Sequence, residues 1–300
     1  MADHNIQFNK VEDFNRWAHV PTLHPAVSSF THLDGVSVEA LNQQYNLYLV
    51  VLMIDYAGDI IYGGRKYEYD AGTMIFHSPG QVSDFRHLAP AYIPKGRVLL
   101  WSPDFIANTD LVKKMNRYTF FSYKIREALI LTNRERVIIN QLLDNIEELI
   151  SDKRSRESDT LIIANIDLLL SYCLHFYERQ FNTFTIENTA LLSRLESFIN
   201  GYLSSDAPFD EGLLNVAFCA EKLNMSAGYF SDLVRNATGQ TALKYIHEKL
   251  IEFAKYRLVN SEKTINEVAY SLGFEYPQHF TRFFRKQTGY SPSEYRKRGF

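Results

Sequence analysis

The hydrophobic positions of this chain follow two different periods. From about Ala26 to Trp101 the apolar residues form short runs or alternate with polar ones, and turns containing Gly or Pro separate the runs. The longest run, from Tyr45 to Tyr56, is rich in β-branched and aromatic residues. After Asp104 the apolar residues recur every three or four positions. This change of period predicts an α+β protein with an antiparallel β domain, a barrel or a sandwich, followed by helices.

The flanks of the β region divide the N-terminal half further. Residues 1–24 lack a clean period and are interpreted as an irregular N-terminal arm, and 25–103 as the β domain. Residues 104–185 are interpreted as a helical segment for dimerisation and coupling. Within it, Thr132 and Glu135 have capping-box spacing and predict the start of one helix. The polar stretch from Asn182 to Asn188 is interpreted as the interdomain linker.

A second helix of this segment is predicted from about Thr160 to Phe181, and it is apolar on more than one face. A helix with two apolar faces has to bury both of them. One face can pack on the β domain or on the preceding helix. The other face is either a dimer interface or a further part of the intrachain core.

The last third of the chain contains one pattern twice. Ala220 and Ala269 are 49 positions apart; one residue is added in the second turn, and Phe230 and Phe280 are 50 positions apart. An internal repeat of this kind sets the architecture of the region in which it occurs. Each copy reads as helix, turn, helix, at about 216–239 and 265–288, and an amphipathic helix at about 242–260 joins them. The spacing predicts an all-α domain over 186–300 with two helix-turn-helix motifs.

Local signals support the second copy in particular. Thr264 and Glu267 have capping-box spacing, and Pro277 suits the first turn of a helix. Gly273 and Gly289 can adopt the left-handed conformation that ends a helix. These signals place the helix ends of the second motif independently of the repeat.

The region from Ser261 to Arg296 resembles the signature of the AraC/XylS family of bacterial transcription regulators. The matching segments are I-x-x-V-A, L-G-F, F-x-R-x-F, G-Y-S-P and Y-R, and the resemblance covers roughly 110 residues at the C-terminus. It implies a transcription regulator, an activator or a repressor, that binds promoter DNA as a homodimer and contacts RNA polymerase. One departure is Leu250, which stands four positions before Ala254 where the family usually has a basic residue.

The stretch Y-E-Y-D-A-G-T-M-I-F-H-S-P-G, which ends at Gly80, resembles the cupin half-motif that many regulators of this family carry in a sensor domain. The resemblance implies a cupin-like barrel that binds a small-molecule effector. Four residues could line its pocket, with core packing as the alternative role for each: Tyr45, Tyr62, Tyr67 and His77.

Metal cupins carry an H-x-H pair, but Ser78 and Pro79 follow His77. A single imidazole is a poor metal site, so we expect no metal, no cofactor and no enzymatic activity. Two alternatives stay open: a metal-cupin enzyme fused to a DNA tether, and a constitutive regulator whose N-terminal domain only dimerises.

Residues on the second helix of each motif are candidates for DNA contacts, because apolar side chains occupy the inward positions. Those suited to base edges are Gln278, His279, Arg282, Gly228, Ser231 and Asp232. Those suited to phosphates are Arg235, Arg285, Lys286 and Arg296, with Lys297 and Arg298 as weaker candidates. Since Asp232 repels phosphate, we expect weaker readout by the first motif.

Charge and cysteine content change this picture little. The formal net charge is −3, yet residues 190–300 hold 14 Lys+Arg against 12 Asp+Glu. That asymmetry has the sign expected of a DNA-reading C-terminus. Cys173 and Cys219 lie in apolar helical runs and are interpreted as buried free thiols. Together with an N-terminus that lacks an apolar signal core, they predict a cytoplasmic protein with no membrane segment. The family resemblance implies that this cytoplasm is bacterial and that the protein is located at the nucleoid.

Overall fold

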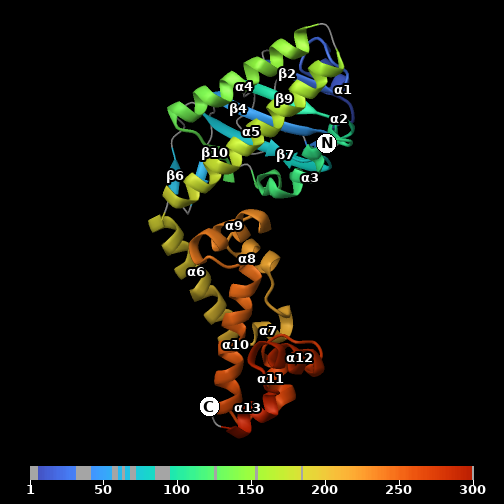
Figure 1. Cartoon of the computed structure of the whole chain (residues 1–300). Coiled ribbons are helices and arrows are strands. Elements are labelled where there is room, and N and C mark those ends of the chain that lie inside the picture. The colour runs from blue at the N-terminus through green and yellow to red at the C-terminus, as the bar shows by residue number, and fades with distance from the viewer. Residues whose placement is uncertain are drawn as a thin grey trace, which may run out of the picture. The chain divides into compact units, whose positions relative to one another are not determined.

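The structure, a computed structural model, describes residues 6–31, 42–55, 60–62, 65–67, 72–84, 95–124, 127–152, 155–183 and 185–298. The chain divides into two compact units, Met1–Thr183 and Phe184–Phe300 (Figure 1). The division lies two residues from the domain boundary expected from the sequence. Unit 1 contains all the described strands, and unit 2 is helical throughout the part that the structure describes.

The described strands of unit 1 form three sheets. The largest has the order β10-β7-β4-β9-β2 and is antiparallel throughout. Its strands are β2 (Val27–Thr31), β4 (Tyr48–Asp55), β7 (Thr73–His77), β9 (Lys95–Trp101) and β10 (Leu129–Ile130). The second sheet consists of β1 (Ile6–Phe8), β3 (Asn42–Tyr45) and β8 (Gln81–Asp84), and the third of β5 (Ile60–Tyr62) and β6 (Arg65–Tyr67).

The closed cupin-like barrel expected from the sequence is not confirmed. In the described residues the five-stranded sheet is open, because its edge strands β10 and β2 are not bonded to one another. Nor is every pairing antiparallel, since β1 runs parallel to β3. The antiparallel β content itself is as expected. Alternation of apolar residues identifies strands, but the long-range pairing of edges decides whether a sheet closes.

The irregular arm expected at residues 1–24 is wrong, because this segment contains β1 and the helix α1 (Val11–Trp17). The helix is held by an aromatic cluster in which the Phe8 ring lies 5.1 Å from Phe14, 5.3 Å from Trp17 and 5.4 Å from Tyr45. A helix of seven residues is too short to show a clear period, and it depends on tertiary packing for its stability.

Two long helices, α4 (Asn133–Ser151) and α5 (Arg156–Thr183), lie side by side across the five-stranded sheet (Figure 1). The capping box predicted for Thr132 and Glu135 is present at the start of α4. Arg97, buried on β9, attaches the sheet to α4 through Asp144 at 2.6 Å and Glu147 at 2.7 Å. Short helices precede this pair: α2 (Pro103–Ile106), α3 (Asp110–Lys114), η1 (Met115–Arg117) and η2 (Thr119–Ser122).

By length and composition alone α5 could cross a membrane. In unit 1, however, it buries nine residues and makes polar contacts with its neighbours. Asp167 on α5 accepts hydrogen bonds from Lys114 at 2.6 Å and from Tyr118 at 3.0 Å. We therefore describe α5 as a core helix of this unit.

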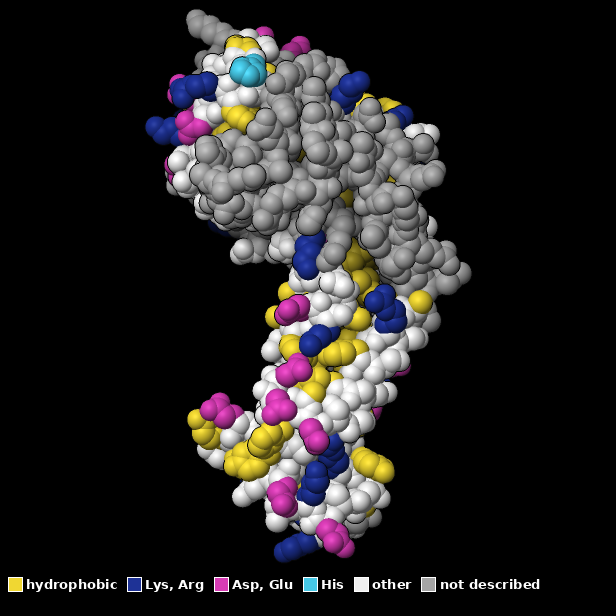
Figure 2. All heavy atoms as spheres, turned by 180° about the vertical axis from the view of Figure 1, so that it is seen from behind, with side chains coloured by type: hydrophobic (Ala, Val, Ile, Leu, Met, Phe, Trp, Pro, Cys, Tyr) yellow, Lys and Arg dark blue, Asp and Glu magenta, His cyan; other side chains and the backbone are white. Residues whose placement is uncertain are grey.

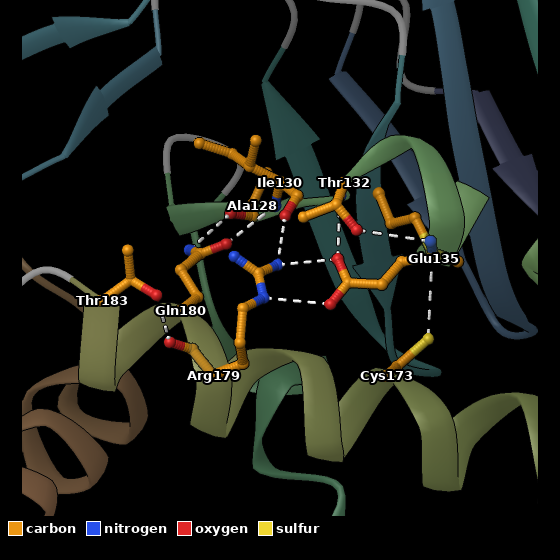
Figure 3. Close-up of polar contacts among 9 residues, drawn as sticks. Ala128, Ile130, Thr132, Glu135, Cys173, Arg179, Gln180 and Thr183 are labelled. Carbon is orange, nitrogen blue, oxygen red and sulfur yellow. Dashed lines mark hydrogen bonds and ion pairs between the residues drawn. The ribbon is translucent and has the colours of Figure 1, made fainter.

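The last turns of α5 are tied to the edge of the sheet (Figure 3). Arg179 forms two hydrogen bonds with the Glu135 carboxylate, at 3.0 and 2.9 Å, and donates to the Ile130 carbonyl at 2.7 Å. The buried Gln180 side chain accepts from Ile130 N–H at 2.8 Å and donates to the Ala128 carbonyl at 3.2 Å. These bonds satisfy the outer edge of β10, which would otherwise be an unpaired strand edge.

The sequence predicted a linker from Asn182 to Asn188, but the structure has helices over most of this segment. Helix α5 continues through Thr183, and α6 (Thr185–Ser204) begins two residues later. Because residues 182–188 show no apolar period, the sequence pattern did not indicate a helix here.

Unit 2 is a bundle of eight described helices around one core. After α6 come α7 (Ala207–Glu211), α8 (Val216–Lys222), α9 (Ala227–Thr238), α10 (Ala242–Asn260), α11 (Ile265–Ser271), α12 (Pro277–Thr288) and α13 (Pro292–Arg298). The two helix-turn-helix pairs are α8–α9 and α11–α12, and α10 links them. Residues of both pairs, of α6 and of α10 share a single hydrophobic cluster.

Candidate DNA-reading surface

Helices α9 and α12 are structural equivalents, as the repeat predicts. Each has 12 residues and ends at a glycine in the left-handed conformation, Gly239 with φ 74° and Gly289 with φ 82°. In each, a threonine near the C-terminus donates to the carbonyl four residues earlier, Thr238 at 2.7 Å and Thr288 at 2.8 Å. The same local chemistry therefore fixes the length and the end of both helices.

The core decides which face of each helix is turned outward. On α12 the buried side chains are Phe280 and Phe284, and on α9 they are Tyr229, Phe230, Leu233 and Val234. Phe283, a third phenylalanine of α12, is only partly buried, and its ring centroid lies 5.0 Å from that of His247 on α10. The exposed residues of both helices are therefore the candidates for contacts outside the unit.

On α12 all the candidate DNA-contacting side chains are exposed. Gln278, His279 and Arg282 lie in the first half of the helix, and Arg285 and Lys286 lie in the second. Since residues near the N-terminus of a recognition helix reach base edges, this order suits the roles that the sequence indicated.

On α9 the corresponding surface is smaller and less basic. Gly228, Ser231 and Asp232 are half-buried, and Arg235 is exposed. The Ser231 hydroxyl donates to the Ala227 carbonyl at 2.7 Å, within its own helix. At the position where α12 carries Arg282, α9 carries Asp232, so the two helices present opposite charges at equivalent places.

On the face of unit 2 visible in Figure 2, acidic and basic side chains are interspersed among the described residues. No large patch of one sign dominates that view. The electrostatic case for DNA binding therefore rests on the exposed cations of α12 (Arg282, Arg285 and Lys286) and not on a basic patch of this face.

Arg296 was expected to contact a phosphate, but in the structure its side chain packs against the end of α10. It is half-buried, and its Nε donates to the Leu258 carbonyl near the end of α10 at 2.7 Å. The guanidinium thus satisfies a carbonyl of the last turn of a helix, a structural role. Lys297 and Arg298 are exposed, and Arg298 lies 4.5 Å from the centre of the Tyr290 ring.

Sequence reasoning missed Arg257 and Tyr276. The Arg257 guanidinium on α10 donates to the carbonyl and hydroxyl of Ser271 at 2.7 Å each and also to the Leu203 carbonyl, so it joins α10, α11 and α6. Tyr276, at the start of α12, has an exposed ring. Leu250, which departs from the family pattern, is fully buried, as an apolar residue on the inner face of α10 should be.

Of the four residues expected to line an effector pocket, the structure brings two together. Tyr45 and His77 are buried and their rings stack, with centroids 5.4 Å apart. The side chains of Tyr62 and Tyr67 lie outside the described residues. Burial lowers the pKa of His77 from its ordinary value of 6.5 to about 4. The described residues contain no group of three His, Cys, Asp or Glu side chains that could hold a metal ion.

The stability of unit 1 should fall as the pH falls from about 6.5 to about 4. Over that window unfolded His77 binds a proton that the folded, buried imidazole does not, so the free energy of unfolding should drop by up to about 3 kcal/mol. Denaturant unfolding at pH 7 and pH 4.5 measures the effect. The variant His77→Gln should lose that part of the pH dependence; an unchanged slope would show that His77 is not responsible.

The chain matches known regulators, one of them over most of its length. A family model described as a helix-turn-helix domain matches residues 219–298. Regulatory protein SoxS of Escherichia coli (strain K12) is 35% identical over 85 residues, which cover 28% of this chain and 79% of SoxS. The HTH-type transcriptional activator RhaS of Salmonella schwarzengrund (strain CVM19633) is 20% identical over 260 residues, 84% of this chain and 86% of RhaS.

The uncharacterized HTH-type transcriptional regulator YijO of Escherichia coli (strain K12) is 28% identical over 156 residues. That match spans 52% of this chain and about half, 51%, of YijO. Each of these three relatives is named as a regulator or as an activator.

Proposed function

The chain belongs to the AraC family of DNA-binding transcription regulators, and from this premise we propose that α12 and α9 read a specific operator in two successive major grooves. The observation that carries the proposal is the exposed row of Gln278, His279 and Arg282 on α12, backed by buried Phe280 and Phe284. A rigid apolar face holds the helix while its polar face meets the DNA.

The chemistry of this row suits base recognition. A glutamine amide can bond adenine through two hydrogen bonds, and an arginine can do the same to guanine. His279 can bond either a phosphate or a base edge. We propose weaker readout by Gly228, Ser231 and Asp232 on α9, where the carboxylate can accept a hydrogen bond from a cytosine amine.

Contacts with the DNA phosphates contribute to the binding affinity and fix the position of the protein along the duplex. We propose Arg235, Arg285 and Lys286 for this role, because all three are exposed. Arg296 is left out, since its Nε is bonded to the Leu258 carbonyl. The 19 residues of α10 span about 28 Å, close to the roughly 34–36 Å of one DNA turn, which supports two motifs on one side of the duplex.

We propose that unit 1 is a cupin-like sensor in which the Tyr45–His77 pair lies near a small-molecule effector. An effector can shift operator binding, or contact with RNA polymerase, only by its differential affinity for two arrangements of the protein. By analogy with RhaS, which is named an activator, we favour activation. The cytoplasm is the compartment in which such a protein meets bacterial DNA.

A second candidate is a constitutive regulator whose unit 1 only dimerises. It is favoured by α5, which exposes Leu161 (51%) and Leu168 (48%), seven residues apart on one face. Two such apolar side chains suit the same face of a second copy. If no metabolite raised the thermal stability of unit 1, this alternative would gain over the sensor, since a ligand at a hundred times its dissociation constant adds about 2.7 kcal/mol.

The proposed function is tested by selecting genomic fragments with the full chain at about 0.15 M salt, where non-specific binding is weak. We expect a motif with two half-elements about 10 base pairs apart. Recovery of unrelated sequences only would contradict sequence-specific reading.

Replacing Arg282 with Ala should weaken binding to the selected operator by about 1–3 kcal/mol and relax the preference at one base pair. Random DNA should be bound nearly as before. The matched control is Arg285→Ala on the same helix. It should weaken binding to operator and random DNA alike, and the slope of the logarithm of the binding constant against the logarithm of the salt concentration should fall by about one, as expected for one lost phosphate contact. Binding titrations over a range of salt concentrations give both quantities. Equal losses on operator and random DNA for Arg282→Ala would contradict base readout.

A further inference from the structure

The turns of the two helix-turn-helix motifs have the same backbone geometry over their first part, and they differ after it by one additional residue in the second motif. Asn224 and Gly273 both have positive φ, 62° and 88°. The next residue of each turn donates to the carbonyl of the small residue at the helix crossing, Met225 to Ala220 at 2.8 Å and Phe274 to Ala269 at 3.1 Å. After this point the second motif contains the additional residue of the repeat, Glu275, before α12 begins.

The two reading helices also start differently. The first residue before α9 is Ser226, which is buried and whose hydroxyl accepts from Tyr229 N–H at 3.2 Å. The equivalent residue before α12 is Tyr276, whose side chain makes no capping hydrogen bond. Serine at this position stabilises a helix, and tyrosine cannot replace it. The second motif therefore lacks a stabilising contact that the first possesses.

In place of a cap, Tyr276 presents an aromatic ring. The side chain is 46% exposed, and its ring meets the exposed His279 edge to face, with centroids 5.4 Å apart. The pKa of Tyr276 is raised, chiefly by the neighbouring Glu275 carboxylate. That carboxylate disfavours the approach of a phosphate. The exposed apolar ring is therefore the part of Tyr276 that we consider for a contact with DNA.

We propose that Tyr276 is a further specificity-determining residue, whose ring contacts the 5-methyl group of a thymine beside the bases read by Gln278 and Arg282. The proposal rests on the proposed function, in which α12 lies in the major groove. Residues at the N-terminus of such a helix reach base edges, and an apolar side chain recognises thymine through its methyl group.

The test replaces each thymine of the selected operator by uracil, which lacks only that methyl group. For the full-length wild-type chain, one position next to the α12 half-element should show about fourfold weaker binding, the effect of one buried methyl group. The variant Tyr276→Phe should keep this difference. The variant Tyr276→Ser should bind the thymine operator about as weakly as the uracil one.

A thermal readout separates this role from a structural one. Because serine restores the helix cap, Tyr276→Ser should raise the melting temperature of unit 2 by a few °C while it weakens operator binding. If wild type is indifferent to uracil at every position, or if Tyr276→Ser still distinguishes thymine from uracil, the inference is overturned although DNA reading by α12 stands. If the full chain selects no operator at all, the proposed function fails and this inference fails with it.

Discussion

Substituting Glu for Ala269 should unfold unit 2. Ala269 is fully buried where α11 meets the core, and the hydrophobic cluster around it includes Leu272, Phe274 and Phe280. A carboxylate at that place would be desolvated among apolar side chains, and the added side chain would also force the helices apart. We expect a loss of more than about 4 kcal/mol in the free energy of unfolding, together with loss of operator binding.

The control for this variant is Ala237→Glu, because Ala237 is exposed on α9. That change should alter stability by no more than about 0.5 kcal/mol. Chemical denaturation of the full chain, followed by the circular dichroism of its helices, compares the two variants. A cooperative transition of unit 2 that survives in Ala269→Glu would show that the helix crossing is placed wrongly.

Substituting Ala for Gly273 should cost about 4 kcal/mol, more than a left-handed backbone alone explains. The residue has φ 88°, and a Cβ atom there would lie 2.4 Å from the carbonyl oxygen of Gly212 and 2.8 Å from the nitrogen of Leu213. Both are backbone atoms of the segment after α7, which cannot move aside as the end of a side chain could. The turn of the second motif therefore requires glycine for two separate reasons.

Gly289→Ala isolates the backbone contribution. Gly289 has φ 82°, almost the same as Gly273, but a Cβ atom at Gly289 would meet no other atom within 4 Å. This control should lose only about 1–2 kcal/mol. Urea unfolding of both variants gives the difference. Equal losses would mean that the close approach of Gly273 to the segment after α7 does not contribute.

Within unit 2 the sequence predicted the helices because their ends are set by nearby residues. The capping box of Thr264 and Glu267, Pro277 in the first turn of α12 and the left-handed Gly289 are all present. The linking helix spans 242–260 as expected. These signals act within a few residues and agree with the hydrophobic period, so local preference and global fold point to the same structure.

Contacts between distant residues were not predictable in the same way. Composition gave no sign that Arg296 would bond the Leu258 carbonyl or that Arg257 would join three helices. An arginine near a basic C-terminus has the same sequence pattern whether it meets a phosphate or a helix end. Only the packing of α13 and α10 distinguishes the two.

In unit 1, too, local features were predictable from the sequence and contacts between distant residues were not. The sequence determined that its first part is built from short strands and its second from long helices, because hydrophobic periods of two and of about 3.6 residues are local properties. The tertiary structure decided that the five-stranded sheet stays open in the described residues, that the N-terminal segment folds into β1 and α1, and that the end of α5 satisfies the edge of β10. Sheet edges and aromatic clusters join residues far apart in the chain, and their pairing depends on the shape of the whole unit.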